Sequence, residues 1–507
     1  MHNPNPAINA NIFLLLGLSL LILFTGISYA SDKGVLLPDF GDEANLAITP
    51  QEAKKLGREF YQELQRKEYV ETDTIINEYI KNLGNQLALH SDDPEDKFTF
   101  FVIPADVANA FATPGGYIGI FEGLVLLAES EDEVAGVVSH EIAHVTQNHM
   151  ARRTSLMKKV SIPILLGMLG VLAATSGNSN AAGATMMGGV GLLQQKSINY
   201  TRNNEYEADR IGIRTLSRAG YDPMGMASFF SRMQQLSRNF GEIPPQILLT
   251  HPVNASRIAE AKGRIDSLPA LVEDPQNANK EKYFRFIQQR MRVNLSRNAA
   301  EAILFYKMIL KNRGKLKDEE KYGYAVALAT TGAVDQTNTF LNYIDPEYVE
   351  VLITITRTES LLSANRIDEA LTVISAAHAN TPRDYIINRQ YIDTLIHSED
   401  KEDLHFAKNL ISELIEDRPE EVELYKLKGR IENLLGQTVS SMQNLAIADF
   451  LLGDNYSAIR KLQELLDKDV SSYHEAKITA RIEQIRNSLN KKELRRLDKT
   501  LRGLTPE

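Results

Sequence analysis

The chain has 507 residues, a formal net charge of −10 and no cysteine. At about 100–200 residues per domain, this length predicts two or three domains. The lack of cysteine excludes disulfides, thiolate zinc sites and cysteine nucleophiles. The negative charge argues against nucleic-acid binding, which favours a basic face. With 43% hydrophobic and 24% charged residues, the composition is that of a globular protein.

The N-terminal residues predict export from the cytoplasm. The apolar run Ile12–Ile27 has the length of a signal-peptide core, and small residues precede a cleavage position after about Ala30. We expect residues 1–30 to be a cleaved signal peptide and 31–48 a linker. No Lys or Arg precedes the run, so an uncleaved membrane anchor is the alternative. The run is short for a membrane span, which needs about 20 residues.

The next segment predicts helices around a small sheet. Thr49 and Glu52 form a capping-box pattern with Pro50 in the first turn. Aromatic and β-branched runs predict strands, and Thr113-Pro114-Gly115-Gly116 predicts a turn between two of them. The expected elements are helices over 50–66, 72–91 and about 131–150, and strands over 98–104, 108–112 and 116–121.

Residues 160–193 form an apolar insert broken by a polar stretch at 176–180. Each apolar piece is short for a membrane span. Four basic residues lie between 152 and 159, so contact with a membrane surface or an apolar partner is one interpretation. The other is a helical hairpin that packs in the core or serves as a lid.

From about residue 285 the pattern is helical and repeats every 34 residues. Each repeat has a small or polar residue and, four positions later, a large apolar one, for example Ala302 with Tyr306 and Ala370 with Ile374. Pro382 and Pro419 end two of the repeats. This resembles tetratricopeptide repeats, which stack into a solenoid with a concave, peptide-sized surface. We expect the solenoid over 285–490 and a charged tail over 491–507; an unrelated helical bundle is the alternative. The repeat positions are Ala302, Gln336, Ala370, Ala407 and Ala458.

The most informative motif is His140-Glu141-Ile142-Ala143-His144. Histidines four residues apart project from the same face of a helix, so both can bind one metal ion. Catalytic zinc uses three protein ligands, and Glu141 can act on water as a general base. An H-E-x-x-H match arises by chance on the order of 1% of the time in a chain this long. The motif therefore predicts one Zn²⁺ per chain.

The third ligand must come from outside the motif. His149 is five residues past His144, roughly 140° around a helix, and is expected to face away. On a helix through 203–209, Glu205 and Asp209 share a face. Glu205 can therefore bind zinc, while Asp209 accepts a hydrogen bond from a ligand histidine. On the same helix Glu207 points elsewhere.

These motifs, with the segments 109–116 and 250–258, resemble zinc metallopeptidases of the CaaX-prenyl-protease type over roughly residues 45–270. The resemblance implies a mostly α (α+β) fold: a helical zincin-type protease domain over 49–275 with a small β-sheet, followed by the all-α repeat solenoid. It also implies functional residues, with zinc ligands at His140, His144 and Glu205 and catalytic residues at Glu141 and Asp209.

Three further features have open interpretations. Near the metal, His251 can take the open zinc position and hold the enzyme inactive, or polarise the substrate oxyanion. Arg257 can contact substrate or brace Asp209. An edge strand through Asn109, Ala110, Phe111 and Ala112 can pair with the substrate backbone.

The combination of signal peptide, protease domain and repeats is similar to periplasmic members of this family. It implies that the clients are unfolded or stalled outer-membrane proteins, which the enzyme degrades or helps to mature. The implied partner is the outer-membrane β-barrel assembly machinery; peripheral membrane contact is compatible with this picture. The alternative is chiefly a repeat-based chaperone or docking scaffold with a latent, histidine-capped zinc site. An intramembrane protease is disfavoured, because the sequence lacks an adequate set of membrane spans.

Overall fold

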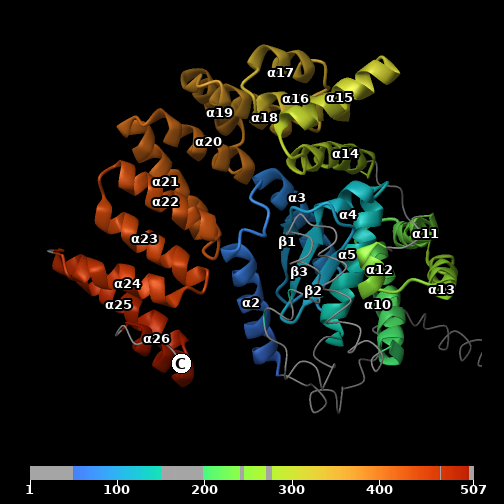
Figure 1. Cartoon of the computed structure of the whole chain (residues 1–507), viewed down its shortest axis with the longest axis horizontal. Helices are drawn as coiled ribbons and strands as arrows, with labels where there is room; N and C mark the ends of the chain where they lie inside the picture. Colours follow the sequence, from blue (N-terminus) through green and yellow to red (C-terminus); the bar gives the residue numbers. More distant parts are fainter. Residues whose placement is uncertain are drawn as a thin grey trace, which may run out of the picture. The chain divides into compact units, whose positions relative to one another are not determined.

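The structure is a computed structural model that describes residues 49–149, 162, 166, 198–239, 245–269, 277–468 and 470–501 (Figure 1). Within these residues helices predominate around one three-stranded sheet, which confirms the mostly α (α+β) expectation. The predicted signal peptide and linker lie outside the described residues. So does the insert over 160–193, apart from Ile162 and Leu166.

Two helices precede the sheet, as predicted. Helix α2 (Pro50–Arg66) begins with the expected capping box: Glu52 N–H donates to the Thr49 side chain, and the Thr49 N–H donates back to Glu52. Helix α3 (Thr74–Leu89) starts at Asp73, whose carboxylate accepts two backbone N–H bonds. Both caps satisfy backbone donors that a helix N-terminus leaves unpaired.

The sheet has the strand order β1-β3-β2, with β1 (Thr99–Ile103) parallel and β2 (Ala110–Thr113) antiparallel to β3 (Tyr117–Phe121). The predicted turn between β2 and β3 contains Gly115 and Gly116, both at φ 85°, a conformation that favours glycine. Side chains of a strand alternate between two faces. Here both faces are covered: one packs against α3 and α5, and the other against α2 and Leu166.

Helix α5 (Glu131–Thr146) carries the H-E-x-x-H motif through the core. It contacts α3, β2, β3 and the later helices α10 (Ile198–Arg218) and α11 (Met224–Asn239). The α5–α10 contact is close because Gly212 faces α5: a Cβ at this position would lie 3.1 Å from the His140 backbone nitrogen. This approach brings the acidic face of α10 against the histidines of α5.

The remaining described elements are helices. Short helix α4 (Glu122–Leu127) precedes α5, and α12 (Gln246–Thr250) and α13 (Ala255–Ile265) follow α11. From residue 277 onward the helices are α14 (Asn277–Asn294), α15 (Ala299–Arg313), α16 (Asp318–Ala329), α17 (Val334–Leu341), α18 (Glu350–Ser363), α19 (Ile367–Asn380), α20 (Tyr385–Ser398), α21 (Lys401–Asp417), α22 (Val422–Leu434), α23 (Thr438–Leu451), α24 (Asn455–Leu466), α25 (Ser472–Ser488) and α26 (Lys491–Leu501). From α15 to α25 each helix packs against the one before it, and α26 packs against α24.

The predicted repeat positions hold at Ala302, Ala370 and Ala407, which are all buried. Ala458 is buried too, on α24. One position is corrected: in α17 the buried residue is Thr337, whereas Gln336 is exposed, so this repeat is shifted by one residue. In α23, Ser441 is also buried, 34 residues past Ala407.

The boundaries of the C-terminal region also differ from the prediction. Helix α14 starts at Asn277, before the expected residue 285, and α26 occupies most of the predicted charged tail. Helix α26 is amphipathic: Leu497 is buried in a cluster with α24 and α25, while its charged side chains face outward. The charged residues of this segment predicted a tail, whereas the structure shows a helix.

Buried ion pairs link α3 to helices of the C-terminal region. Arg290 pairs at 2.6 Å both with Asp73, the cap of α3, and with Glu359 of α18. Arg418, after α21, pairs with Glu78 of α3. Removing one partner of a buried ion pair leaves an uncompensated charge. These contacts therefore tie α3 to the C-terminal helices.

A buried carboxyl group beside α14 makes stability depend on pH. Burial, and then the negative charge of Glu71, raise the pKa of Glu122 to about 9. Its partner Asn294 donates a 2.9 Å hydrogen bond to Oε1. Because the folded state holds this proton more tightly, stability is highest below the unfolded pKa of 4.5 and falls as pH rises toward 9.

We therefore expect Glu122→Gln to gain stability relative to the wild type as pH rises through this window. The gain should reach at most about 1.4 kcal/mol per pH unit. Urea unfolding at about pH 5 and pH 8.5 measures it, with Glu464→Gln, a half-exposed surface position, as the control. A difference between variant and wild type that stays constant with pH would contradict the assignment.

No helix in the described part of the chain is both long enough and apolar enough to cross a membrane.

Candidate metal centre

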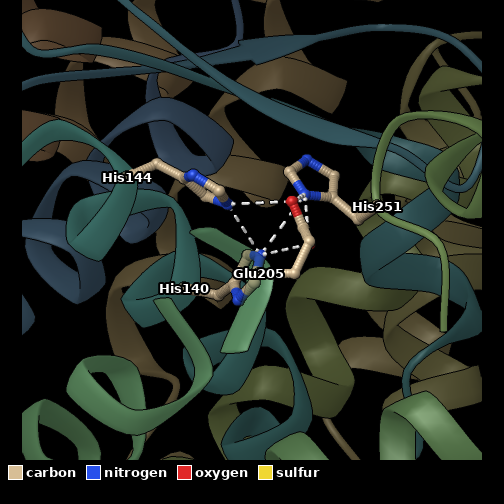
Figure 2. Close-up of side chains that lie close together, drawn as sticks. All are labelled: His140, His144, Glu205 and His251. Atoms are coloured by element: carbon tan, nitrogen blue, oxygen red, sulfur yellow. Dashed lines mark hydrogen bonds and ion pairs between the residues drawn. The ribbon is translucent and has the colours of Figure 1, made fainter. Parts of the chain in front are cut away.

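Four side chains from three elements converge in the interior (Figure 2). His140 and His144 come from α5 and Glu205 from α10, while His251 is the residue that ends α12. Three of the four are buried, and His251 is partly buried. The structure thus brings together the residues predicted from the motif and the acidic helix.

The ligand atoms of this cluster all lie within 4.8 Å of one another. Nε2 of His144 is 3.0 Å from Nε2 of His140. The Glu205 carboxylate lies 3.4 Å from His140 Nε2 and 3.5 Å from His144 Nε2. One cation placed among these atoms would reach all of them.

The donor set fits a metal ion on chemical grounds. A neutral imidazole whose Nδ1 carries the proton presents only a lone pair at Nε2, and a carboxylate presents only lone pairs. Lone pairs packed this closely in a buried site repel one another unless a cation lies between them. Imidazole nitrogen and carboxylate oxygen are the ligands of catalytic metal sites of the His₂Glu type.

Asp209 and Arg257 contact the cluster from outside, at His140 and Glu205. The Asp209 carboxylate lies 3.0 Å from Nδ1 of His140, the ring nitrogen that faces away from the cluster. Arg257 donates two hydrogen bonds to Asp209, of 2.7 and 2.8 Å, and its Nη1 is 3.0 Å from Glu205. Arg257 is only 2% exposed. These contacts favour the second of the two interpretations of Arg257, a brace for Asp209, over a substrate contact.

The two histidines of the motif differ in charge preference. Burial lowers the pKa of His144 well below its usual value, and positive charge at His140 lowers it further. Burial also opposes charging of His140, but Asp209 and Glu205 outweigh it and raise the pKa to about 9. Positive neighbours hold the pKa of Glu205 well below its usual range despite burial. The carboxylate therefore stays ionised and available to a cation.

Glu141 lies next to the ligands but faces a different partner. Its side chain is buried, and Oε1 is 3.3 Å from Nε2 of His251. Among the described residues Oε1 has no hydrogen-bond partner of good geometry. A buried carboxylate oxygen without a fixed donor beside the cluster can take a proton from a reacting group.

His251 lies inside the cluster. Its Nδ1 is 3.1 Å from Glu205 and 3.3 Å from Nε2 of His140, while Nε2 of the same ring faces Glu141. A ring nitrogen at this distance from two ligand atoms fits a fourth ligand better than a donor to a substrate oxyanion.

As expected, neither His149 nor Glu207 belongs to the four-residue cluster, but His149 does not face away from His144. Nδ1 of His149 is 2.8 Å from Nδ1 of His144, and Glu207 contacts the other ring nitrogen of His149. The helical wheel fails here because α5 ends at Thr146 and Asn148 takes a left-handed φ of 53°. The turn brings His149 back against the helix. An asparagine after the motif, a residue that tolerates this conformation, was the available signal.

The predicted edge strand is present as β2, which begins at Ala110 and ends at Thr113, so Asn109 lies just before it. Strand β2 pairs with β3 on one side, and in the described ranges no strand pairs with its other side. The side chains of Asn109 and of Ala110–Thr113 are buried, so this edge offers backbone groups rather than side chains. Strand β2 also contacts α5, the helix that carries the motif.

Comparison with known proteins finds similarity over the part of the chain that carries this cluster. Residues 75–265 match the model of peptidase family M48. The beta-barrel assembly-enhancing protease of Yersinia pestis is 31% identical over 309 residues, which are 60% of this chain and 62% of the relative. The Escherichia coli K12 protein of the same name is 33% identical over 242 residues, 48% of this chain and 50% of the relative.

A Vibrio cholerae counterpart is 40% identical over 246 residues, 48% of this chain and 50% of its own length. The matches therefore span about half to three fifths of these relatives. The family match lies within the protease domain predicted over 49–275 and contains all the residues of the cluster.

Proposed function

We propose that this chain, whose residues 75–265 match the model of peptidase family M48, is a periplasmic zinc-dependent endopeptidase that degrades misfolded or stalled outer-membrane proteins and assists their assembly. The observation that carries the catalytic part is the convergence of His140, His144 and Glu205 beside Glu141. A metal cofactor follows from the family and this donor set; zinc is the metal that we propose.

In this proposal His140, His144 and Glu205 hold one Zn²⁺ per chain, and Asp209 orients His140 through its Nδ1. When bound, zinc polarises the scissile carbonyl and lowers the pKa of water. Glu141 accepts the proton of the attacking water and returns it to the leaving amine. Arg257 keeps Asp209 in place rather than touching the substrate.

We propose that the substrate backbone adds to the open edge of β2 at Asn109–Ala112. Backbone pairing of this kind reads an extended conformation rather than a sequence. Because β2 packs against α5, a peptide on this edge would run past the metal centre. This suits unfolded clients, which expose extended chain.

We further propose that helices α14–α25 are tetratricopeptide repeats that bind clients or the outer-membrane β-barrel assembly machinery. The support is the series of consecutively packed helices with small buried residues, and the names of the relatives, which refer to β-barrel assembly. The predicted signal peptide supports a periplasmic location. A second candidate function, a chaperone with a latent protease site, is favoured by the position of His251 inside the cluster.

Metal removal tests the proposed function. We expect the purified chain to contain about one zinc, to cleave an unfolded outer-membrane protein and to lose this activity on chelation. Activity should return with stoichiometric Zn²⁺, since catalytic sites of this kind are inactive without the ion. Proteolysis that persists after the zinc has been stripped would contradict the proposal. Intact client binding without any cleavage would favour the chaperone function.

A further inference from the structure

Two side chains outside the ligand cluster, His149 and Glu207, form a chain of contacts that starts at Nδ1 of His144. His149 is buried, and its Nδ1 is 2.8 Å from Nδ1 of His144. Its other nitrogen, Nε2, is 3.1 Å from the Glu207 carboxylate. Nε2 of His144 is directed into the cluster, 3.0 Å from His140. The order from outside to inside is therefore Glu207, His149, His144 and the metal centre.

Hydrogen-bond chemistry sets the protons along this series. A carboxylate only accepts, so Glu207 requires a proton on Nε2 of His149. In a neutral His149 ring, Nδ1 is then an acceptor. Two facing Nδ1 atoms form a hydrogen bond only when one of them carries a proton, so His144 carries it. This tautomer leaves the lone pair of His144 Nε2 free to bind a metal ion.

The two histidines of the motif thus have separate supports. Asp209 faces Nδ1 of His140, and His149 faces Nδ1 of His144. Ligand histidines usually donate this second N–H to a carboxylate, a carbonyl or water. For His144 the acceptor is another histidine, which the left-handed turn at Asn148 places there.

We infer that His149, held by Glu207, is a positioning residue that fixes the tautomer and orientation of the metal ligand His144. The inference rests on the metal centre of the proposed function. It assigns to His149 no contact with the ion or the substrate. Loss of such a support typically weakens metal binding about 10–100-fold.

The test compares two amide variants, which place the acceptor at different distances from the backbone because glutamine is one methylene longer than asparagine. In His149→Asn the side-chain oxygen can occupy the position of Nδ1 and accept from His144. In His149→Gln the amide reaches the position of Nε2 instead. We expect Zn²⁺ affinity, measured by competition with a chromophoric chelator, to fall about 10–100-fold for His149→Gln. His149→Asn should recover most of this loss.

Three further measurements separate positioning from simple folding support. The unfolding temperature of the metal-free protein should be nearly equal in both variants. The visible absorption of Co²⁺-loaded protein, which reports ligand geometry, should change in His149→Gln and resemble the wild type in His149→Asn. Arg210→Gln is the matched control, because this residue of α10 pairs with Glu260 on the surface. It should leave affinity unchanged.

The outcomes distinguish the inference from the proposed function. Equal Zn²⁺ affinity in the wild type and both variants would overturn the positioning role while leaving the metal centre intact. Equal loss in both variants would also overturn it, because acceptor position would then not matter. Absence of tight metal binding in the wild type would instead overturn the proposed function.

Discussion

Replacing Glu141 by glutamine is expected to lower cleavage of an unfolded outer-membrane protein by about 10²–10⁴-fold, the usual contribution of a general base. The amide keeps the size and shape of the carboxylate but cannot accept a proton. Glu141 is buried, and its Oε1 lies 3.3 Å from Nε2 of His251 without good hydrogen-bond geometry, so the substitution removes basicity without breaking a well-formed hydrogen bond. Initial rates at saturating zinc measure the effect.

Zinc content and thermal unfolding of this variant should match the wild type, since none of the three metal ligands changes. Glu260→Gln is a suitable control, because it removes a carboxylate at the surface of α13. Wild-type cleavage by Glu141→Gln would show that another residue activates water. Restored outer-membrane assembly in cells that express this variant would separate a chaperone role from proteolysis.

The sequence predicted those parts of the site that depend on local periodicity. His140 and His144 share a helix face because they are four residues apart, and Glu205 and Asp209 share another for the same reason. The caps of α2 and the glycine turn between β2 and β3 were also predictable, because each is set by adjacent residues. The closeness of α5 and α10 needed the structure. Gly212 permits this close approach, but the residues around Gly212 do not predict which helix it faces.

Predictions were wrong, or left two interpretations open, where a helix ended or where burial decided the role of a side chain. No glycine or proline marks the end of α5, so its extension to Met150 turned His149 the wrong way. The sequence left two interpretations of Arg257 open, because the carboxylate that it contacts is 48 residues away. The repeat register slipped at Gln336 because a period fixes spacing but not which face is buried.

Replacing His251 by alanine is expected to raise proteolysis about tenfold at saturating zinc. In the structure the ring fills the space between Glu205, His140 and the base Glu141. A catalytic metal site keeps one position open for water or substrate, and a fourth protein ligand closes it. A tenfold gain in activity corresponds to about 1.4 kcal/mol of free energy that favours the state in which His251 occupies the fourth ligand position. The value of kcat/KM for an unfolded client measures it.

The same substitution should weaken zinc binding, because the centre loses one donor. Activity and zinc content must therefore be measured together. Thr250→Ala, which removes only a hydroxyl that bonds the Ile247 carbonyl, controls for disturbance of α12. Adding Glu141→Gln should abolish the gain, which would assign it to this site. If His251→Ala instead loses activity with zinc retained, the ring stabilises the substrate oxyanion. The expectation that His251 closes the metal site at rest would then be wrong, and the latent-protease function would lose its support.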